Sequence, residues 1–585
     1  MENLNEKSTK RRPLEWWERR KLENNGCHSQ DWSAIRLCDA TDLNNIRNVE
    51  FVGAVSVGRL DSSEGSRIEN ARLENCVVGD NAVIRNIGSH IRNCLIEPGA
   101  KIINTGKIDF EPEALCGVGT EVSVLDETGS RPVTIFPGLS AQLALLMARA
   151  PKWNERHLKP LVEQKIEKRA PLHRIGAGSL VEGCGSIVNV SIDPDVRIIG
   201  ARNLRNGSIV NNTAAGRSFT FVGSGVDAEN FIIEDGSVDA GVILRNCYVG
   251  QGSMLSNGFT AHDSLFFANC SMENGEACAL FAGPYTVSMH KSSLLIGCQT
   301  SFMNAGSGTN QSNHMYKLGP VHWGILERGV KTSSDSYLML GAKIGAFSLL
   351  MGQHKTHPDS SQFPFSYLFG DEKGATVVVP GVMLRSCGLL RDEQKWPTRD
   401  RRLKRKLPLH DRIIFDVLSP LTVENMLTAI DVIDHLLTRQ ADDDRYLRYR
   451  GMKFTRASLE RSRHMYQLAI YKYLSIRIGD LGFPKKDEGA KAEEWVDIAG
   501  LPMTRSDLQS VMESATIEEM ERRFSEAFDK YAELERKWIG ARFGENWRRN
   551  PEVIADYSLE FDRMIEEDRA RYLDDLAAQN EMLAL

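Results

Sequence analysis

The sequence predicts a β-solenoid built from hexapeptide repeats and followed by an α-helical domain, and three observations lead to this prediction. Glycine is unevenly placed, since 40 of the 48 glycines lie in residues 51–390 and only 7 in residues 391–585. Charge is distributed in the opposite way, since the last 195 residues carry 72 Asp, Glu, Lys and Arg side chains and the first 390 carry 78. A six-residue period runs through the glycine-rich part. The chain therefore changes character between residues 390 and 410.

The period is clearest between residues 76 and 106, where every sixth residue is small and most of the residues two positions later are branched aliphatics. The small residues are Cys76, Ala82, Gly88, Cys94, Ala100 and Gly106. The residues two positions later are Val78, Ile84, His90, Ile96 and Ile102. The dipeptide Asn-Cys also recurs after 18 residues, which are three hexads.

A period of six fits neither a lone strand, which alternates every two residues, nor a helix, which repeats every 3.6. It fits a triangular solenoid in which each hexad supplies one short strand and one corner. The aliphatic side chain fills the narrow interior, the small residue avoids a clash, and Gly or Asn at a corner tolerates positive φ. The alternative is a β-sandwich with many turns.

Later copies of the hexad extend the predicted solenoid to about residue 390. Aliphatic residues keep the six-residue step at Ile192 and Ile198, at Ile243, Val249 and Leu255, and again from Ile344. Helical patterns occupy the rest of the chain. They predict helices over residues 13–25, 141–150, 153–169, 421–439, 454–478 and 516–543, and one that begins at Pro551.

These patterns divide the chain into six parts. We expect an N-terminal helical and extended cap (1–50), a first solenoid segment (51–139), a helical excursion (140–172), a second solenoid segment (173–390), a basic linker (391–408) and a C-terminal helical domain (409–585). The basic linker holds seven Lys and Arg residues between Lys395 and Lys406. We interpret them as a solvated linker or an inter-domain ion-pair surface, with a phosphate contact as the alternative.

Composition also bounds the compartment and the partners. A net charge of −6 argues against a strongly basic nucleic-acid binder. The N-terminus has no apolar signal region, and no stretch reaches 18 apolar residues, so we expect neither secretion nor a membrane span. The 11 cysteines are odd in number and form no CxxC pair, which disfavours a disulfide framework and a thiolate zinc site. A reducing cytoplasm is the expected location.

Histidine marks the stretch most suited to proton transfer, because 6 of the 13 histidines lie between residues 262 and 357. Within this stretch a hexad strand from Lys343 runs into a loop with His354, His357 and Asp359, and then into an aromatic turn over residues 363–365.

This arrangement and the hexads resemble the left-handed β-helix, or hexapeptide-repeat, superfamily, and locally its xenobiotic-type acyltransferase branch. The matching positions are Ile344, Gly345, Phe347, His354, Asp359, Phe363, Pro364 and Phe365. The resemblance implies a left-handed coil, a trimer, acyl-CoA as co-substrate and no metal. It also implies that His354 is the general base, with His357 as the second choice because this loop is longer than the family's. The overall plan is similar to large uncharacterised hexapeptide-repeat proteins of Bacteroidetes and related bacteria.

A second polar cluster lies upstream of the histidine-rich loop. Amide and hydroxyl side chains lead to Asn313 and His314, and His322 and Trp323 follow. Amides read hydroxyl groups and an indole stacks on a ring, so these residues suit a sugar or a nucleotide. With Asp359, they are the candidate substrate-binding residues. The alternative is a polar ladder at solenoid corners.

Three functional hypotheses follow. The first is an acyltransferase that moves an acyl group, expected to be acetyl, from CoA to a sugar, nucleotide-sugar or similar small acceptor, with His354 as base. The second is a non-catalytic protein that binds a nucleotide-sugar or scaffolds a complex through its helices. The third is a zinc hydro-lyase similar to the γ-type carbonic anhydrases, which would need three imidazoles such as those of His314, His322 and His354.

Overall fold

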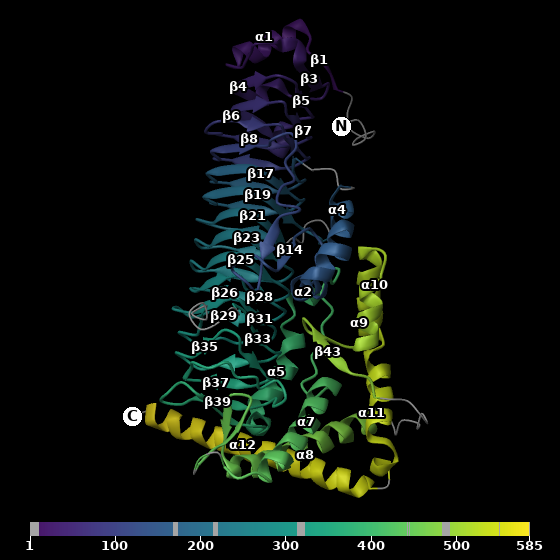
Figure 1. Ribbon diagram of the computed structural model, residues 1–585. Helices are drawn as coiled ribbons and strands as arrows, with labels where there is room; N and C mark the ends of the chain where they lie inside the picture. Colours follow the sequence, from purple (N-terminus) through teal and green to yellow (C-terminus); the bar gives the residue numbers. More distant parts are fainter. Residues whose placement is uncertain are drawn as a thin grey trace.

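Short parallel strands stack into one tall column, with helix α1 (Trp16–Asn24) at one end and the C-terminal helices along one side and across the other end (Figure 1). This computed structural model describes residues 11–167, 173–213, 220–312, 322–441, 443, 445–481, 492–548 and 550–583. The parallel stack fits a β-solenoid, as the hexads predict.

The hexads between residues 76 and 106 form consecutive coils of this column. Ile68 on β6 (Arg67–Glu74) pairs with Ile84 on β8 (Val83–Arg85), which pairs with Ile102 on β11 (Lys101–Ile103). All three isoleucines are completely buried. The small residues Cys76 and Ala82 are buried as well, so both repeated positions face the interior.

Asparagine occupies successive corners of the N-terminal coils. Asn48, Asn70, Asn86 and Asn104 all have φ between 51° and 54°, the left-handed region that asparagine tolerates better than most residues. Their side-chain amides form a ladder, in which each donates to the next at 2.8, 2.9 and 2.9 Å. The ladder ties one coil to the next outside the aliphatic core.

The column begins earlier than residue 51, where the cap was expected to end. Strands β2 (His28–Ser29) and β3 (Ile35–Cys38) already pair in parallel with β4 (Ile46–Val52) and β5 (Val55–Val57). These first coils lie in the glycine-poor part of the chain, so glycine content does not reveal them. Strand β1 (Arg11–Pro13) pairs antiparallel with β3 at the edge.

The excursion also begins earlier than expected, because the parallel strands stop at β12 (Lys107–Asp109) and resume at β15 (Arg174–Ile175). Residues 110–139 are not solenoid, since they contain the antiparallel hairpin of β13 (Glu121–Ser123) and β14 (Pro132–Thr134). The excursion continues through α2 (Ala141–Arg149), α3 (Pro151–Trp153), η4 (Asn154–Leu158) and α4 (Lys159–Glu167). The column is continuous across it, because Lys107 pairs directly with Ser186.

In the second solenoid segment, one hexad is oriented differently from the sequence prediction. Ile243 is 41% exposed and its neighbour Leu244 is completely buried, so the inward row is shifted by one residue there. The cause is coil length, since Asp227 pairs with Ile243 after 16 residues and Ile243 pairs with Thr260 after 17, rather than 18. The long strands of this segment are β17 (Ser186–Ile192), β19 (Asn203–Val210), β21 (Asp227–Glu234), β23 (Ile243–Val249) and β25 (Thr260–Phe266).

The remaining strands of the column are shorter. They are β7 (Val77–Val78), β9 (Ile91–Arg92), β10 (Leu95–Ile96), β16 (Leu180–Glu182), β18 (Arg197–Ile199), β20 (Phe221–Val222), β22 (Ser237–Val238), β24 (Met254–Ser256), β26 (Ser271–Glu273), β27 (Glu276–Cys278), β28 (Phe281–Ala282), β29 (Val287–Ser288), β30 (Leu294–Ile296), β31 (Cys298–Thr300), β32 (Asn310–Ser312), β33 (Gly324–Leu326), β34 (Lys331–Thr332), β35 (Tyr337–Met339), β36 (Lys343–Ile344), β37 (Leu349–Met351), β38 (Gln353–His354), β39 (Tyr367–Gly370) and β40 (Thr376–Val379).

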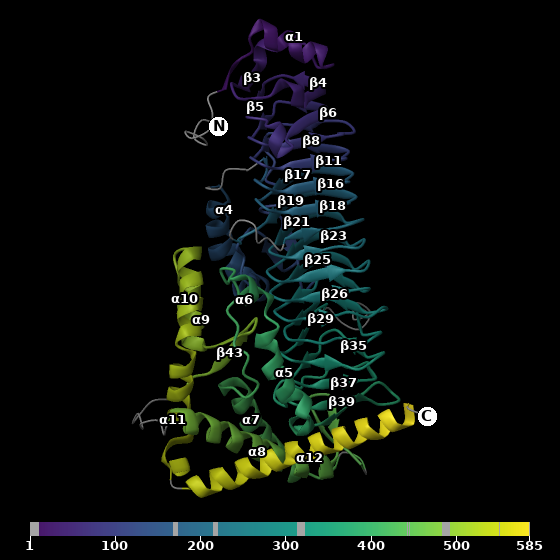
Figure 2. The same cartoon turned by 180° about the vertical axis from the view of Figure 1, so that it is seen from behind.

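The C-terminal part is joined to the column by strands as well as by helices. The hairpin of β41 (Leu447–Tyr449) and β42 (Met452–Phe454) continues the last coil, because β42 pairs in parallel with β40. A second hairpin, β43 (Trp495–Ile498) and β44 (Leu501–Thr504), lies on the helical side (Figure 2). Among the described residues, no helix is long and apolar enough to cross a membrane.

The helices expected in this part are present, with one difference. Residues 516–543 form two helices rather than one, since α10 ends at Asp529 and α11 begins at Tyr531. The helices are α5 (Cys387–Thr398), α6 (Arg401–Arg405), α7 (Pro420–Leu437), α8 (Arg456–Leu481), α9 (Arg505–Met512), α10 (Ile517–Asp529), α11 (Tyr531–Arg548) and α12 (Pro551–Leu583).

One arginine of the basic linker fastens α6 to the column, and a second forms a buried ion pair within the linker. Arg401 donates to the carbonyl of Gly252 at 2.7 Å and to the hydroxyl of Ser271 at 3.0 Å. Arg402 is buried and forms an ion pair with the buried Asp400 at 2.8 Å. These contacts agree with an inter-domain surface for this part of the linker.

Candidate functional site

The candidate base His354 lies on β38 with its ring inside the column, and it is completely buried. Its Nδ1 is 2.9 Å from the hydroxyl oxygen of Thr376, and its Nε2 has no hydrogen-bond partner among the described residues. Burial lowers the pKa of His354 to about 4, so the ring is neutral at pH 7. A neutral imidazole can accept a proton, but a general base must lie within hydrogen-bond reach of its substrate.

The other two loop residues are placed away from His354. His357 is exposed, whereas His354 is buried. Asp359 forms an ion pair with Arg450 at 2.8 Å, and its carboxylate accepts a hydrogen bond from the Ser361 hydroxyl at 2.6 Å. Asp359 therefore links this loop to the turn between β41 and β42.

Packing accounts for most of the motif that resembles the acyltransferases. Phe347 and Phe365 are buried and stacked, with ring centroids 5.3 Å apart and planes 7° apart. Phe363 is buried against Phe454 at 5.1 Å. A Cβ added to Gly345 would lie 2.4 Å from the carbonyl oxygen of Ser360, so only glycine fits there. These residues have a structural role in this chain.

Of the four residues in the polar cluster, Asn313 and His314 lie outside the described residues, and His322 and Trp323 are half-buried just before β33. The guanidinium of Arg131 lies over the Trp323 ring, 4.6 Å from its centroid, in cation–π geometry. Arg131 is held there because it also donates to the carbonyl of Ala148 at 2.9 Å. The excursion thus covers one side of the predicted aromatic platform.

Further charged groups surround this platform. Arg149, at the end of α2, is exposed to solvent. The protein around its guanidinium still removes part of the hydration, and this desolvation lowers the pKa of Arg149. Its charge neighbours are Glu327, Arg131 and Asp497. Burial raises the pKa of Glu327 to about 7, although Lys343 at 3.5 Å favours the charged carboxylate. We call Trp323, Arg131, Arg149 and Glu327 the indole–arginine cluster.

Sequence reasoning found Trp323 and missed the other three members of this cluster. Arg131 comes from the hairpin, Arg149 from α2 and Glu327 from a solenoid corner after β33. No spacing rule joins positions so far apart, because the fold of the excursion back onto the column brings them together. The absence of glycine from residues 140–169 indicated the excursion but not where it would dock.

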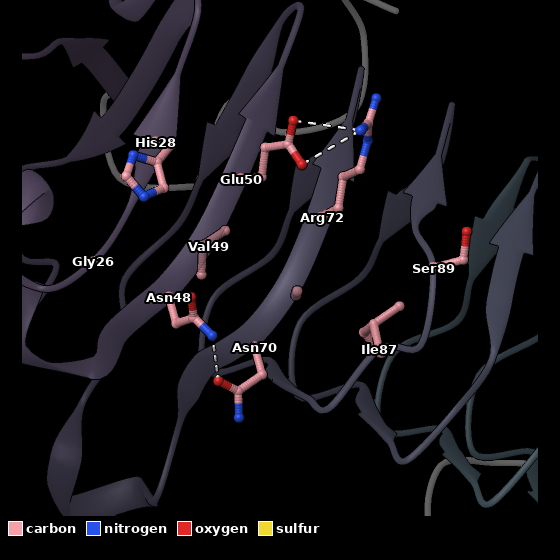
Figure 3. Close-up of a pocket in the computed structure, with 10 residues that line it drawn as sticks. Gly26, His28, Asn48, Val49, Glu50, Asn70, Arg72, Ile87 and Ser89 are labelled. Atoms are coloured by element: carbon pink, nitrogen blue, oxygen red, sulfur yellow. Dashed lines mark hydrogen bonds and ion pairs between the residues drawn. The ribbon is translucent and has the colours of Figure 1, made fainter.

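A separate hollow of about 560 Å³ lies on the column near its N-terminal end (Figure 3). Its walls include the Glu50–Arg72 ion pair, at 3.3 Å, and the Asn48–Asn70 hydrogen bond. The lining residues are Gly26, His28, Asn48, Val49, Glu50, Asn70, Ala71, Arg72, Ile87 and Ser89. It holds none of the predicted site residues and no Phe, Tyr or Trp, so it lacks the apolar lining typical of small-molecule sites.

The zinc hypothesis requires at least three ligand side chains held close together. Within the part of the chain that the structure describes, no group of three or more His, Cys, Asp or Glu side chains is arranged to hold a metal ion. His322 and His354 are therefore not part of such a group, and His314 lies outside the described residues.

Two protein-family descriptions match parts of this chain. A family described as a domain of unknown function, DUF4954, matches residues 11–437, well over half of the 585 residues. The chain belongs to the DUF4954 family. The DUF4954 match covers the column, the basic linker and α7, and therefore includes every candidate site residue named above. A second domain of unknown function, DUF6819, matches residues 482–571, which hold the β43–β44 hairpin and helices α9 to α11.

The chain is also similar to a curated protein. An "Uncharacterized protein" of Treponema pallidum (strain Nichols) is 26% identical to it in an alignment over 463 residues that covers 73% of this chain and 62% of the relative. The chain thus spans less than two thirds of the length of that relative. Neither family description nor this relative's name states an activity.

Proposed function

We propose that the protein binds an anionic ring compound of the nucleotide-sugar class at the indole–arginine cluster. The observation that carries this proposal is the position of Arg131 over Trp323, with its guanidinium carbon 4.6 Å from the ring centroid. Arg149 is close enough to Arg131 for their charges to interact. Two guanidinium groups and an indole from separate parts of the chain supply the two features that such a ligand needs, which are countercharge and a stacking surface.

Each member of the cluster has a defined task in this proposal. The planar guanidinium groups bind phosphate oxygens through paired hydrogen bonds, and the indole stacks on a base or sugar ring. Glu327, whose pKa is about 7, exists in both protonation states at neutral pH, so it can donate to or accept from a sugar hydroxyl. The cluster holds no hydroxyl, thiol or amine nucleophile, and binding is the function it supports best.

A thermal-shift experiment tests this proposal, with uridine diphosphate N-acetylglucosamine and acetyl-CoA as the two probes. We expect the nucleotide-sugar to raise the unfolding temperature of the wild-type protein, because a ligand that binds only the folded state stabilises it. Trp323→Ala and Arg149→Ala should each abolish that increase. Matched controls are Trp17→Ala and Arg20→Ala on α1, at exposed positions far from the cluster along the chain, which should retain it. An equal response of Trp323→Ala and wild type would refute the site.

Acyl transfer from acetyl-CoA is the second candidate, and one observation favours it. His354 is oriented by Thr376 through Nδ1 while Nε2 is left unpaired, which is the arrangement of an imidazole base held by a neighbour. The reaction requires the coil around β38 to open, because the ring is completely buried. His354→Ala should then lower kcat by roughly 10²–10⁴. An unchanged kcat on a confirmed acceptor would eliminate this candidate.

The finer architecture belongs to the same proposal. We infer from the resemblance to the hexapeptide-repeat superfamily that the column is a left-handed coil and that the protein is an oligomer, with a trimer as the implied state. We also infer a cytoplasmic location from the cysteine pattern. The parallel stacking of short strands supports a solenoid. Sedimentation equilibrium decides the oligomeric state, and an experimental map of the main chain decides the hand.

A further inference from the structure

The β43–β44 hairpin lies against the excursion, which carries two members of the indole–arginine cluster. On α2, the side-chain amide of Gln142 donates to the carbonyl of Ile498 at 3.3 Å and to that of Ala499 at 3.2 Å. Gln142 and Arg149 are seven residues apart, which is about two helical turns, so both lie on one face of α2. Arg149 therefore lies on the side of α2 that faces the hairpin.

Asp497 carries the charge of this hairpin, because the other residues of β43 and β44 are uncharged. Its carboxylate is an electrostatic neighbour of both Arg149 and Glu327, which are members of the cluster. The backbone N–H of Gly500, in the turn between the two strands, donates to Oδ1 of Asp497 at 2.6 Å. The turn thus fixes the position of the carboxylate beside the cluster.

The second carboxylate oxygen of Asp497 is only partly engaged. Its Oδ2 lies 3.5 Å from Nη1 of Arg328, and neither atom has a hydrogen-bond partner among the described residues. This separation is longer than a charge-assisted hydrogen bond, so Oδ2 can still attract a second cation. Arg328 directly follows Glu327 in the chain, which places this ion pair at the edge of the cluster.

We propose that Asp497 competes with the phosphate of the ligand for the guanidinium of Arg149, so that ligand binding and docking of the β43–β44 hairpin oppose each other. This inference rests on the proposed function. A carboxylate and a phosphate offer a guanidinium the same paired acceptors and the same sign of charge. The cluster lies in the part that matches DUF4954 and Asp497 in the part that matches DUF6819, so the competition couples the two family domains.

The other carboxylate beside the ligand site cannot have this role. Glu327 belongs to the column, and it lies 3.5 Å from the ammonium group of Lys343, which is also part of the column. Only the charge of Asp497 moves when the hairpin moves. Because coupling between two equilibria is reciprocal, a ligand that displaces Asp497 weakens the docking of the hairpin, and a loosened hairpin strengthens ligand binding.

Isothermal titration calorimetry with uridine diphosphate N-acetylglucosamine tests the competition in the full-length protein. Asp497→Asn keeps the shape of the side chain and removes its charge, so it should bind the probe roughly tenfold more tightly than the wild type. The matched control is Asp416→Asn, which removes a carboxylate paired with Arg477 elsewhere in the helical part and should bind like the wild type.

The outcomes separate this inference from the proposed function. If the wild type binds the probe and Asp497→Asn binds it equally or more weakly, the competition is refuted and the ligand site stands. If the wild type does not bind the probe, the ligand site is refuted and the competition with it. An Asp497 that only neutralises Arg328 would lower the unfolding temperature when substituted and leave the Kd unchanged.

Hydrogen exchange of the wild-type protein provides a second measurement that needs no substitution. Saturating probe should increase the exchange rates of the backbone amides of β43 and β44, because the ligand takes the place of the carboxylate that holds the hairpin. The amides of the β41–β42 hairpin are the internal control and should exchange at the same rate with and without the probe. Exchange in β43 and β44 that stays constant or slows when the probe binds overturns the proposal.

Discussion

The carboxylate of Glu234 lies 3.0 Å from Nε2 of His410 and joins the column to the segment that follows the basic linker, 176 residues later. Glu234 also accepts hydrogen bonds from the Gly138 backbone N–H at 2.7 Å and from the Tyr248 hydroxyl at 2.8 Å. One buried carboxylate thus joins the solenoid, the excursion and the segment that follows the basic linker. This junction determines how several parts of the protein pack.

The Glu234–His410 pair predicts a stability contribution that is largest in mildly acidic solution. Burial disfavours both charges, but their mutual hydrogen bond and attraction outweigh it, so the pKa of Glu234 is lowered and that of His410 is raised. The contribution of Glu234 is lost as pH falls below its unfolded pKa of about 4.3, and that of His410 is lost as pH rises above about 6.5. His410→Asn should therefore lower the urea midpoint most between these values.

The exposed pair His464–Glu560 provides the control for this experiment. Its atoms are 2.8 Å apart, but both side chains are about half exposed, at 50% and 52%. Solvent screening limits the contribution of such a pair to the free energy of unfolding to at most about 1 kcal/mol. His464→Asn should leave the urea midpoint nearly unchanged at every pH. An equal effect of the two substitutions would show that burial is not the cause.

His354 predicts the opposite pH dependence. Its pKa in the folded protein is about 4, against about 6.5 when unfolded, so the unfolded chain binds more protons between these values. Stability should rise from pH 4 to pH 6.5 by about 3 kcal/mol from this residue and stay constant above. The double variant His354→Leu/Thr376→Val removes both hydrogen-bond partners and should lack this slope. Urea midpoints from pH 4.5 to 7.5 measure the difference, and an identical slope in both proteins would contradict the prediction.

The hexads predict the inward side chain well where the coil keeps 18 residues. Ile84 and Ile102 are 18 residues apart, pair directly and are both buried, although each has a second aliphatic beside it, Val83 and Ile103. At Ile243 and Leu244 two adjacent aliphatics compete, and the length of the coil, not the local pattern, decides that Leu244 faces inward. Val122 and Val133 are buried like solenoid residues, although they lie in the antiparallel hairpin of the excursion. The alternation of apolar and polar residues alone does not distinguish a solenoid strand from a strand of this hairpin.

The candidate site was less predictable, because its charged members are non-local. Trp323 was found as an aromatic beside polar residues, but Arg131 packs on it only after the excursion folds back. His354 was found by resemblance, and its burial depends on the coil formed by Thr376 and the strands around it. Contacts of this kind follow from tertiary packing, which composition and spacing do not encode.

Arg328 predicts a strong dependence of stability on one buried charge. Its guanidinium is almost completely buried, lies 4.9 Å from the ring centroid of Phe302, and forms an ion pair with Asp497 at 3.5 Å. Asp497→Ala removes the countercharge and should destabilise the protein by about 3–5 kcal/mol, because a buried cation is left without its partner. Differential scanning calorimetry measures the loss.

Two further variants complete this test. The double variant Arg328→Met/Asp497→Ala should recover much of the lost stability, since it no longer buries a charge. Arg450→Ala breaks the exposed ion pair with Asp359, whose side chains are 43% and 39% exposed, and should cost less than about 1 kcal/mol. If the double variant is no more stable than Asp497→Ala, the cost comes from lost packing rather than from the unpaired charge.

The asparagine ladder predicts two separable contributions at one corner. Asn70 has a φ of 53° and hydrogen-bonds through its side chain to both Asn48 and Asn86. Asn70→Gly keeps a residue that tolerates positive φ and removes only the ladder, at a cost of about 1 kcal/mol because the position is exposed. Asn70→Ala loses the ladder and adds the strain of a left-handed backbone, a further 1–2 kcal/mol or so. Urea unfolding of both variants measures the difference, and equal midpoints would mean that positive φ at this corner carries no cost and that hydrogen bonding alone selects asparagine.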